Sequence, residues 1–162
     1  MRKLVLAAVL AACGPSSQEV RTAKLATYKI GSSELLHLAI DATKVEYAIG
    51  EIAEDRLEFI TAPRFYSSTG DLESPGAEGY VQLRPGSVQV QFIVQVAPTA
   101  DGTAAVTVTP KTFQKLSGSP KPRELQPDDP YLPPFVLGRA DALQLDIYHR
   151  AQQFVVPPPS SP

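Results

Sequence analysis

The sequence predicts an α+β fold, a two-layer sandwich in which two helices cover one face of an antiparallel sheet of four or five strands. Residues 87–97 place apolar side chains at every second position, opposite a face made mostly of glutamine, and two segments, 33–44 and 139–154, repeat apolar residues at helical spacing. Clean alternation is typical of an antiparallel sheet with one packed and one wet face, so both helices are expected on the apolar face.

The first half of the chain contains a short strand, a helix and two further strands. Residues 27–30 alternate, and Gly31-Ser32-Ser33 then offers an N-cap for the helix of residues 33–44. A strand is expected from Val45, with a bulge at Gly50, where the apolar parity slips. Glu54-Asp55 is the expected turn, and residues 56–65 return as the next strand.

The second half starts with the clearest strand, residues 87–97. Asp101-Gly102 predicts a hairpin turn, after which Ala104, Val106 and Val108 return on the packed face. Pro110 has no N–H to donate, so its strand lies at an edge or stops there. Residues 115–138 are an expected loop. The buried stripe of the last helix, residues 139–154, is Ala140, Leu143, Ile147, Ala151 and Phe154.

The N-terminus has the anatomy of an export signal. Arg2-Lys3 precedes a short apolar run, too short for a membrane-spanning helix, and Cys13 is the one cysteine of the chain. Residues 10–13, Leu-Ala-Ala-Cys, resemble the lipobox of bacterial lipoproteins, although twelve preceding residues are few for such a signal. Plain secretion and a retained apolar N-terminus are the alternatives.

The lipobox resemblance implies cleavage before Cys13 and acylation of its thiol, hence a membrane anchor. Residues 1–12 are then the signal peptide, 13–18 a lipidated cysteine with a flexible tether, 19–155 a single domain and 156–162 a proline-rich tail. In that family, a lipoprotein without Asp after the cysteine is usually located on the periplasmic face of the outer membrane, if the host has two membranes. Gly14 fits this pattern.

The order of elements also resembles the helix-grip domains of small outer-membrane assembly lipoproteins. The matching stretches are Tyr28 to Ile60, Val88 to Val108 and Ala140 to Phe154, about two-thirds of the chain. The resemblance lies in the pattern of elements rather than in a sharp motif. A known member has two such domains and a long N-terminal segment, whereas this chain has one domain and a short tether, so a shared partner does not follow.

Composition excludes several function classes. The formal net charge is −2, and removing Arg2 and Lys3 with the signal leaves 13 basic against 17 acidic residues, which disfavours nucleic-acid binding. One cysteine and two histidines cannot assemble the usual zinc site. We expect neither a metal nor a cofactor, and catalytic motifs for phosphate binding, metalloprotease or serine hydrolase chemistry do not occur.

Neither the two histidines nor the acidic residues of the first hairpin form a recognisable site. His37 and His149 each lie on an expected helix and are interpreted as solvated, with an ion pair from His37 to Asp41 one turn later as an option. Glu51, Glu54, Asp55 and Glu58 surround the first hairpin, but their spacing fits no calcium loop. We interpret them as a solvated turn, and no catalytic residues are predicted.

The wet face of the sheet is the candidate interaction face. Its members are uncharged and capable of hydrogen bonding around one isoleucine: Gln89, Gln91, Ile93, Gln95, Thr107 and Thr109. Ordinary solvent exposure is the alternative. The sequence therefore predicts a non-enzymatic accessory or protein-interaction module held in the cell envelope by lipid. A small-ligand carrier (lipid or glycan), using the gap between helices and sheet, is the second hypothesis, and a small envelope hydrolase is the third.

Overall fold

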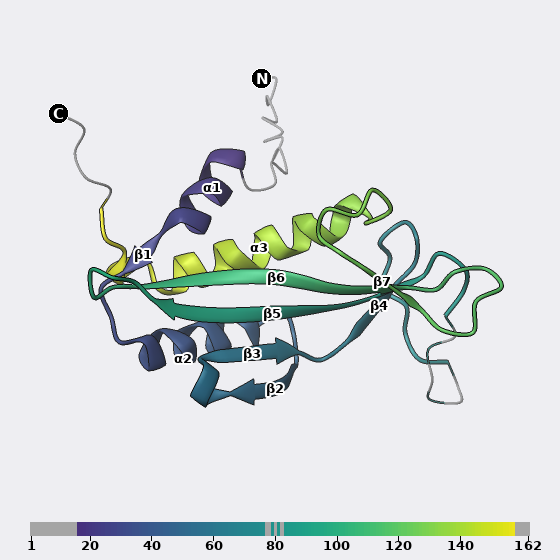
Figure 1. Cartoon of the computed structure of the whole chain (residues 1–162), viewed down its shortest axis with the longest axis horizontal. Helices are drawn as coiled ribbons and strands as arrows, with labels where there is room; N and C mark the ends of the chain where they lie inside the picture. The colour runs from purple at the N-terminus through teal and green to yellow at the C-terminus, as the bar shows by residue number, and fades with distance from the viewer. Residues whose placement is uncertain (1–15, 77–78, 80, 82, 158–162) are drawn as a thin grey trace, which may run out of the picture.

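The computed structural model describes residues 16–76, 79, 81 and 83–157 and has the predicted α+β sandwich architecture. Its sheet is wholly antiparallel and has seven strands, more than the four or five expected, in the order β1-β6-β5-β3-β2, with β4 beside β5 and β7 beside β6. The described residues form three α-helices rather than two, namely α1 (Ser17–Leu25), α2 (Ser32–Thr43) and α3 (Pro134–Arg150) (Figure 1).

A long hairpin of β5 (Val88–Pro98) and β6 (Ala104–Gln114) runs the length of the molecule (Figure 1). The Asp101-Gly102 turn is confirmed, and the Asp101 carboxylate accepts hydrogen bonds from the hydroxyls of Thr99 and Thr103, which lowers its pKa. Strand β1 (Thr27–Tyr28) pairs with β6 near this turn, whereas β4 (Arg64–Tyr66) and β7 (Arg123–Leu125) lie at the opposite end.

The core lies between the sheet and the helices, as the alternation predicts. The five side chains of β5 that face the helices are at most 2% exposed: Val88, Val90, Phe92, Val94 and Val96. Helix α2 packs on β5, helix α3 packs on β6, and the two helices contact each other. The stripe from Ala140 to Ala151 is buried, and Phe154 is partly buried. Each large side chain buried here contributes about 1.5–3 kcal/mol.

Strand β2 (Ile49–Ala53) begins four residues later than expected. Residues 44–46 form the turn that leads out of α2, the Tyr47 N–H donates to the Thr43 carbonyl, and Val45 is 88% exposed. The chain needs these residues to turn from helix to sheet, so Val45 is not a strand residue. The register shift between Ile49 and Glu51 confirms the bulge at Gly50.

The strand expected over residues 56–65 is two strands, β3 (Glu58–Thr61) and β4, separated at Ala62-Pro63. A proline lacks the N–H that a continuous ladder needs, which explains the break. The expected turn at Glu54-Asp55 is the short 3-10 helix η1 (Glu54–Arg56). Leu57, between η1 and β3, adopts a left-handed backbone conformation with φ 52° and still packs against the core.

Helix α1 corrects the expected flexible tether of residues 13–18. Residues 13–15 lie outside the described part, but Ser17 and Gln18 begin a helix capped by Ser16. Ser16 and Glu19 form a reciprocal capping box, and the hydrogen bonds from Ser16 lower the pKa of the Glu19 carboxyl. In the described ranges, no helix combines the length and apolar character needed to cross a membrane.

The expected loop of residues 115–138 also contains regular structure. It includes β7, and helix α3 starts at Pro134 rather than at residue 139, since proline is favourable in the first turn and Val136 extends the buried stripe. Helix α3 ends at Arg150, and Gln152–Phe154 form the 3-10 helix η2. Val156, expected in the tail, donates to the Thr27 carbonyl, and residues 158–162 lie outside the described part.

Candidate functional site

The candidate interaction face is the side of the sheet opposite the helices. Neighbouring strands pair Gln95 with Thr107 and Ile93 with Thr109, so all six predicted residues share this outer face of β5 and β6. The exposed members are Gln95, Thr107 and Thr109, while Gln89, Gln91 and Ile93 are partly covered. The structure therefore brings the predicted residues together on one surface.

Ile93 lies at the centre of this face beside a second isoleucine. Ile60 of β3 is its direct partner, and Glu51 of β2 pairs with Ile60 in turn. A shallow pocket of about 190 Å³ opens over the two isoleucines. Its lining also includes charged residues from three strands and η1, which the prediction of an uncharged face did not include: Glu51, Arg56, Glu58 and Lys111. The surface is thus an apolar centre with a mixed-charge border.

The break between β3 and β4 is bridged by side chains that hold this face in place. Phe92 donates its backbone N–H to the Thr61 hydroxyl oxygen at 2.9 Å. The side-chain Nε2 of Gln91 donates to the Thr61 carbonyl at 3.0 Å. Both bonds satisfy groups that a continuous β3–β4 ladder would have paired. Gln91 therefore has a structural bond, which fixes its position at the edge of the face.

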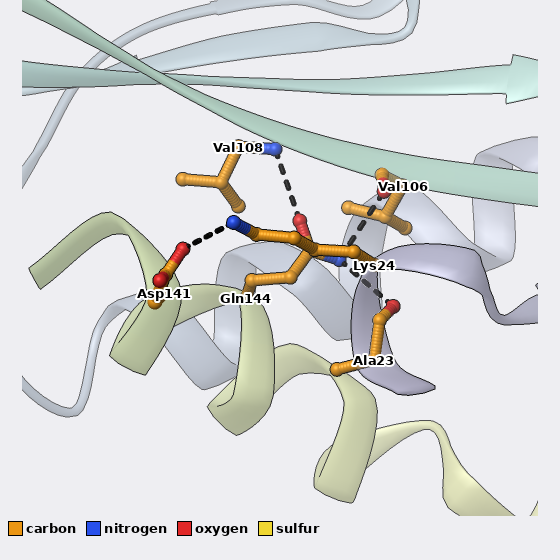
Figure 2. Close-up of polar contacts among 6 residues, drawn as sticks. All are labelled: Ala23, Lys24, Val106, Val108, Asp141 and Gln144. Carbon is orange, nitrogen blue, oxygen red and sulfur yellow. Dashed lines mark hydrogen bonds and ion pairs between the residues drawn. The ribbon is translucent and has the colours of Figure 1, made fainter. Parts of the chain in front are cut away.

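The outer edge of β6 is closed by a helix side chain rather than by a strand. Strand β1 pairs with Ala104 and Ala105, strand β7 pairs from Thr112 onward, and neither reaches Val106 or Val108. Figure 2 shows that Gln144 of α3 fills this position: its Oε1 accepts the Val108 N–H at 3.1 Å and its Nε2 donates to the Val106 carbonyl at 3.2 Å.

Gln144 also connects this edge to helix α1. Its Nε2 lies 3.3 Å from the Ala23 carbonyl, and an ion pair between Lys24 and Asp141 joins α1 and α3 at 2.5 Å. The Val108 N–H points away from β5, toward Gln144. Residues two apart in a strand direct their backbone nitrogens to the same side, so the Pro110 nitrogen also lies on this side of β6, where neither β1 nor β7 pairs with it. This confirms the predicted edge position of Pro110. With this edge covered, the exposed face is a better docking surface than the edge.

The ionisable residues singled out in the sequence lie on separate elements. His37 is exposed on α2, with Nδ1 2.7 Å from the Ser33 carbonyl oxygen, and His149 is exposed in the last turn of α3. Glu54 and Asp55 belong to η1, whereas Glu51 and Glu58 face the outer side of the sheet. Within the described ranges, no three His, Cys, Asp or Glu side chains gather as metal ligands. Cys13 lies outside the described residues.

Sequence reasoning missed two features. The first is a groove of about 770 Å³ between α1 and α3, whose lining includes Val20, Leu25 and Gly138. The Ser16/Glu19 capping box signals the helix that forms one wall. The second is an ionic cluster of Glu46, Arg64 and Arg139. No local pattern signals this cluster, because tertiary packing brings together residues far apart in the chain.

Comparison of the sequence with models of known protein families found no match, and comparison with curated proteins found no significantly similar relative. The class that the structure defines is an α+β sandwich with an open antiparallel sheet. Function must therefore be argued from the surfaces described above.

Proposed function

We propose that this protein is an envelope lipoprotein, anchored through acyl chains on Cys13, whose folded body is a non-enzymatic protein-interaction module. The anchor is supported by the resemblance of residues 10–13 to a lipobox and by the use of the sole cysteine there. Two or more acyl chains hold a protein on a membrane far better than one. Helix α1 begins at Ser17, four residues after Cys13, so an anchor at that cysteine would hold the folded body close to the membrane.

The observation that carries the interaction role is the outer face of the sheet. Ile60 and Ile93 are adjacent apolar residues, surrounded by glutamine, threonine and oppositely charged side chains. A small apolar centre with a polar border is the usual anatomy of a protein-docking surface. A partner for this face has an apolar anchor for the isoleucine pair and hydrogen-bonding groups around it.

The second hypothesis, a carrier of a small ligand (lipid or glycan), finds support at a different place from the gap between helices and sheet. The gap between helices and sheet is occupied by fully buried side chains such as Leu36, Phe92 and Leu143. The α1–α3 groove instead offers a largely apolar lining with Lys24 and Asp141 at its border. This groove favours a carrier as the second candidate function. A hydrolase has no comparable supporting feature among the described side chains.

The docking role is tested with Ile93→Lys, using Val45→Lys as the control because Val45 is an exposed aliphatic residue in the turn after α2, outside the proposed face. Partners of the wild-type protein are identified by cross-linking in intact cells, and the purified partner is then titrated with each variant. The proposal predicts that Ile93→Lys weakens the measured affinity at least tenfold, that Val45→Lys does not, and that both retain the wild-type melting temperature. Equal affinities for all three proteins would contradict docking through this face.

A further inference from the structure

An ionic cluster joins three elements at the helix side of the sheet. Glu46 follows α2, Arg64 opens β4, and Arg139 lies in the second turn of α3. One oxygen of Glu46, Oε1, lies 3.6 Å from Nη1 of Arg64 and 3.7 Å from Nη1 of Arg139. Two guanidinium groups therefore share a single carboxylate oxygen.

Buried aromatic rings fix both guanidinium groups. Arg64 lies over the ring of Tyr47 at 4.4 Å, and Arg139 lies over the ring of Tyr66 at 4.6 Å. Tyr47 in turn packs edge-on against Phe92 in the core. An arginine stacked on a rigid ring is pre-organised, so little conformational entropy is lost when it binds a ligand.

The hydrogen-bonding capacity of the cluster is only partly used. Both Arg–Glu46 distances exceed normal hydrogen-bond lengths. Within the described residues, Nε of Arg139 and the hydroxyl of Tyr66 are buried without a hydrogen-bond partner. Arg64 donates to the Glu46 carbonyl, and Arg139 makes a long 3.4 Å bond to the Gly70 carbonyl. Buried donors without partners are costly, and a ligand that accepts from them gains that energy.

Glu46 is a weakly held occupant of this position. Its side chain is 46% exposed, more than that of either arginine. A second carboxylate, Asp146 of α3, has its pKa raised by burial first and then by the charge of Glu46. An oxyanion at the same position would meet the same charge of Asp146, so what makes the Glu46 carboxylate displaceable is its exposure and its long distances to the two arginines.

We propose that Arg64 and Arg139 form a binding site for an oxyanion, the carboxylate or phosphate group of a ligand, and that Glu46 holds this site in the free protein. The guanidinium fork matches the geometry of both groups and binds them with charge-assisted hydrogen bonds. The site is separate from the outer face of the sheet, because its residues lie on the helix side. It does not depend on the proposed docking role.

The test is a titration of the purified protein with inorganic phosphate and, separately, with acetate, at constant ionic strength and with amide chemical shifts as the readout. Saturable shifts at the cluster with either ion support the site, and the tighter ion identifies the kind of ligand. Arg64→Gln and Arg139→Gln are each expected to weaken binding about tenfold or more, since each removes charge-assisted hydrogen bonds. Arg150→Gln, an exposed arginine on the same helix, is the control and leaves binding unchanged.

Glu46→Gln separates a binding site from a purely structural ion pair. If Glu46 occupies the site, its neutralisation strengthens oxyanion binding. Arg139→Lys provides a second check because it keeps the charge and removes the fork, so binding weakens while folding is retained. Absence of saturable shifts with both ions in the wild type and in Glu46→Gln, or equal binding by the arginine variants, would overturn the proposal.

Discussion

Replacing Gln144 with leucine tests how helix α3 closes the edge of the sheet. Gln144 is 3% exposed and makes three hydrogen bonds, to the Val108 N–H and to the carbonyls of Val106 and Ala23. Leucine is similar in size, so the substitution removes the bonds while leaving most of the packing intact. Each buried group left without a partner costs about 1–3 kcal/mol.

Because Val108 is only partly buried, water can restore part of this loss, and a total of about 2–5 kcal/mol is expected. For a domain of this size, that corresponds to a decrease in melting temperature of roughly 6–15 °C. Urea unfolding followed by circular dichroism measures the free energy, with the exposed Gln152→Leu as the control. Hydrogen exchange adds a local readout, since the Val108 amide should lose its protection.

An unfolding free energy within about 0.5 kcal/mol of the wild type, together with a still protected Val108 amide, would refute this reasoning. It would show that the edge of β6 is stable without the glutamine. Loss of protection at Val108 with unchanged global stability would instead confine the role of Gln144 to the local edge.

Three further predictions concern the core, the bulge and the tyrosines. Phe92→Asp buries a charge and should abolish folding, whereas Gln91→Asp costs about 1 kcal/mol; comparable thermal melts would show that the faces are assigned wrongly. Gly50→Val should cost about 1–3 kcal/mol in urea unfolding, because a Cβ there lies 3.2 Å from backbone atoms of Thr61 and Ala62; wild-type stability would contradict this. Burial raises the pKa of Tyr28 and Tyr47 to about 12, so the unfolded state ionises first and stability falls as pH rises from 10 to 12; urea midpoints that stay constant over this range would contradict it.

The parts of the fold that depend on local periodicity could be predicted from the sequence. The alternation of residues 87–97 and the Asp101-Gly102 turn locate the central hairpin because both signals are short-range. Strand boundaries that depend on tertiary geometry could not be found this way. Val45 continues an alternating pattern, yet the chain needs that residue to turn out of α2.

Helix α1 and the early start of α3 were missed for a different reason. Serine, glycine and proline are frequent in loops, but Ser16 is a helix cap and Pro134 begins a helix. The outer face could be predicted because strand alternation places its residues together. The arginine pair could not, since Arg64 and Arg139 meet only when β4 and α3 pack against the end of α2.

The central claim, lipid anchorage through Cys13, is tested most directly by mass spectrometry of the mature N-terminal peptide from a cell-envelope fraction. The account predicts a peptide that begins at Cys13 and carries the added mass of acyl chains on its sulfur. A Cys13→Ser variant should retain residues 1–12 and lose the lipid. A peptide that begins at Met1, or one that begins at residue 13 with a free thiol, would contradict the account.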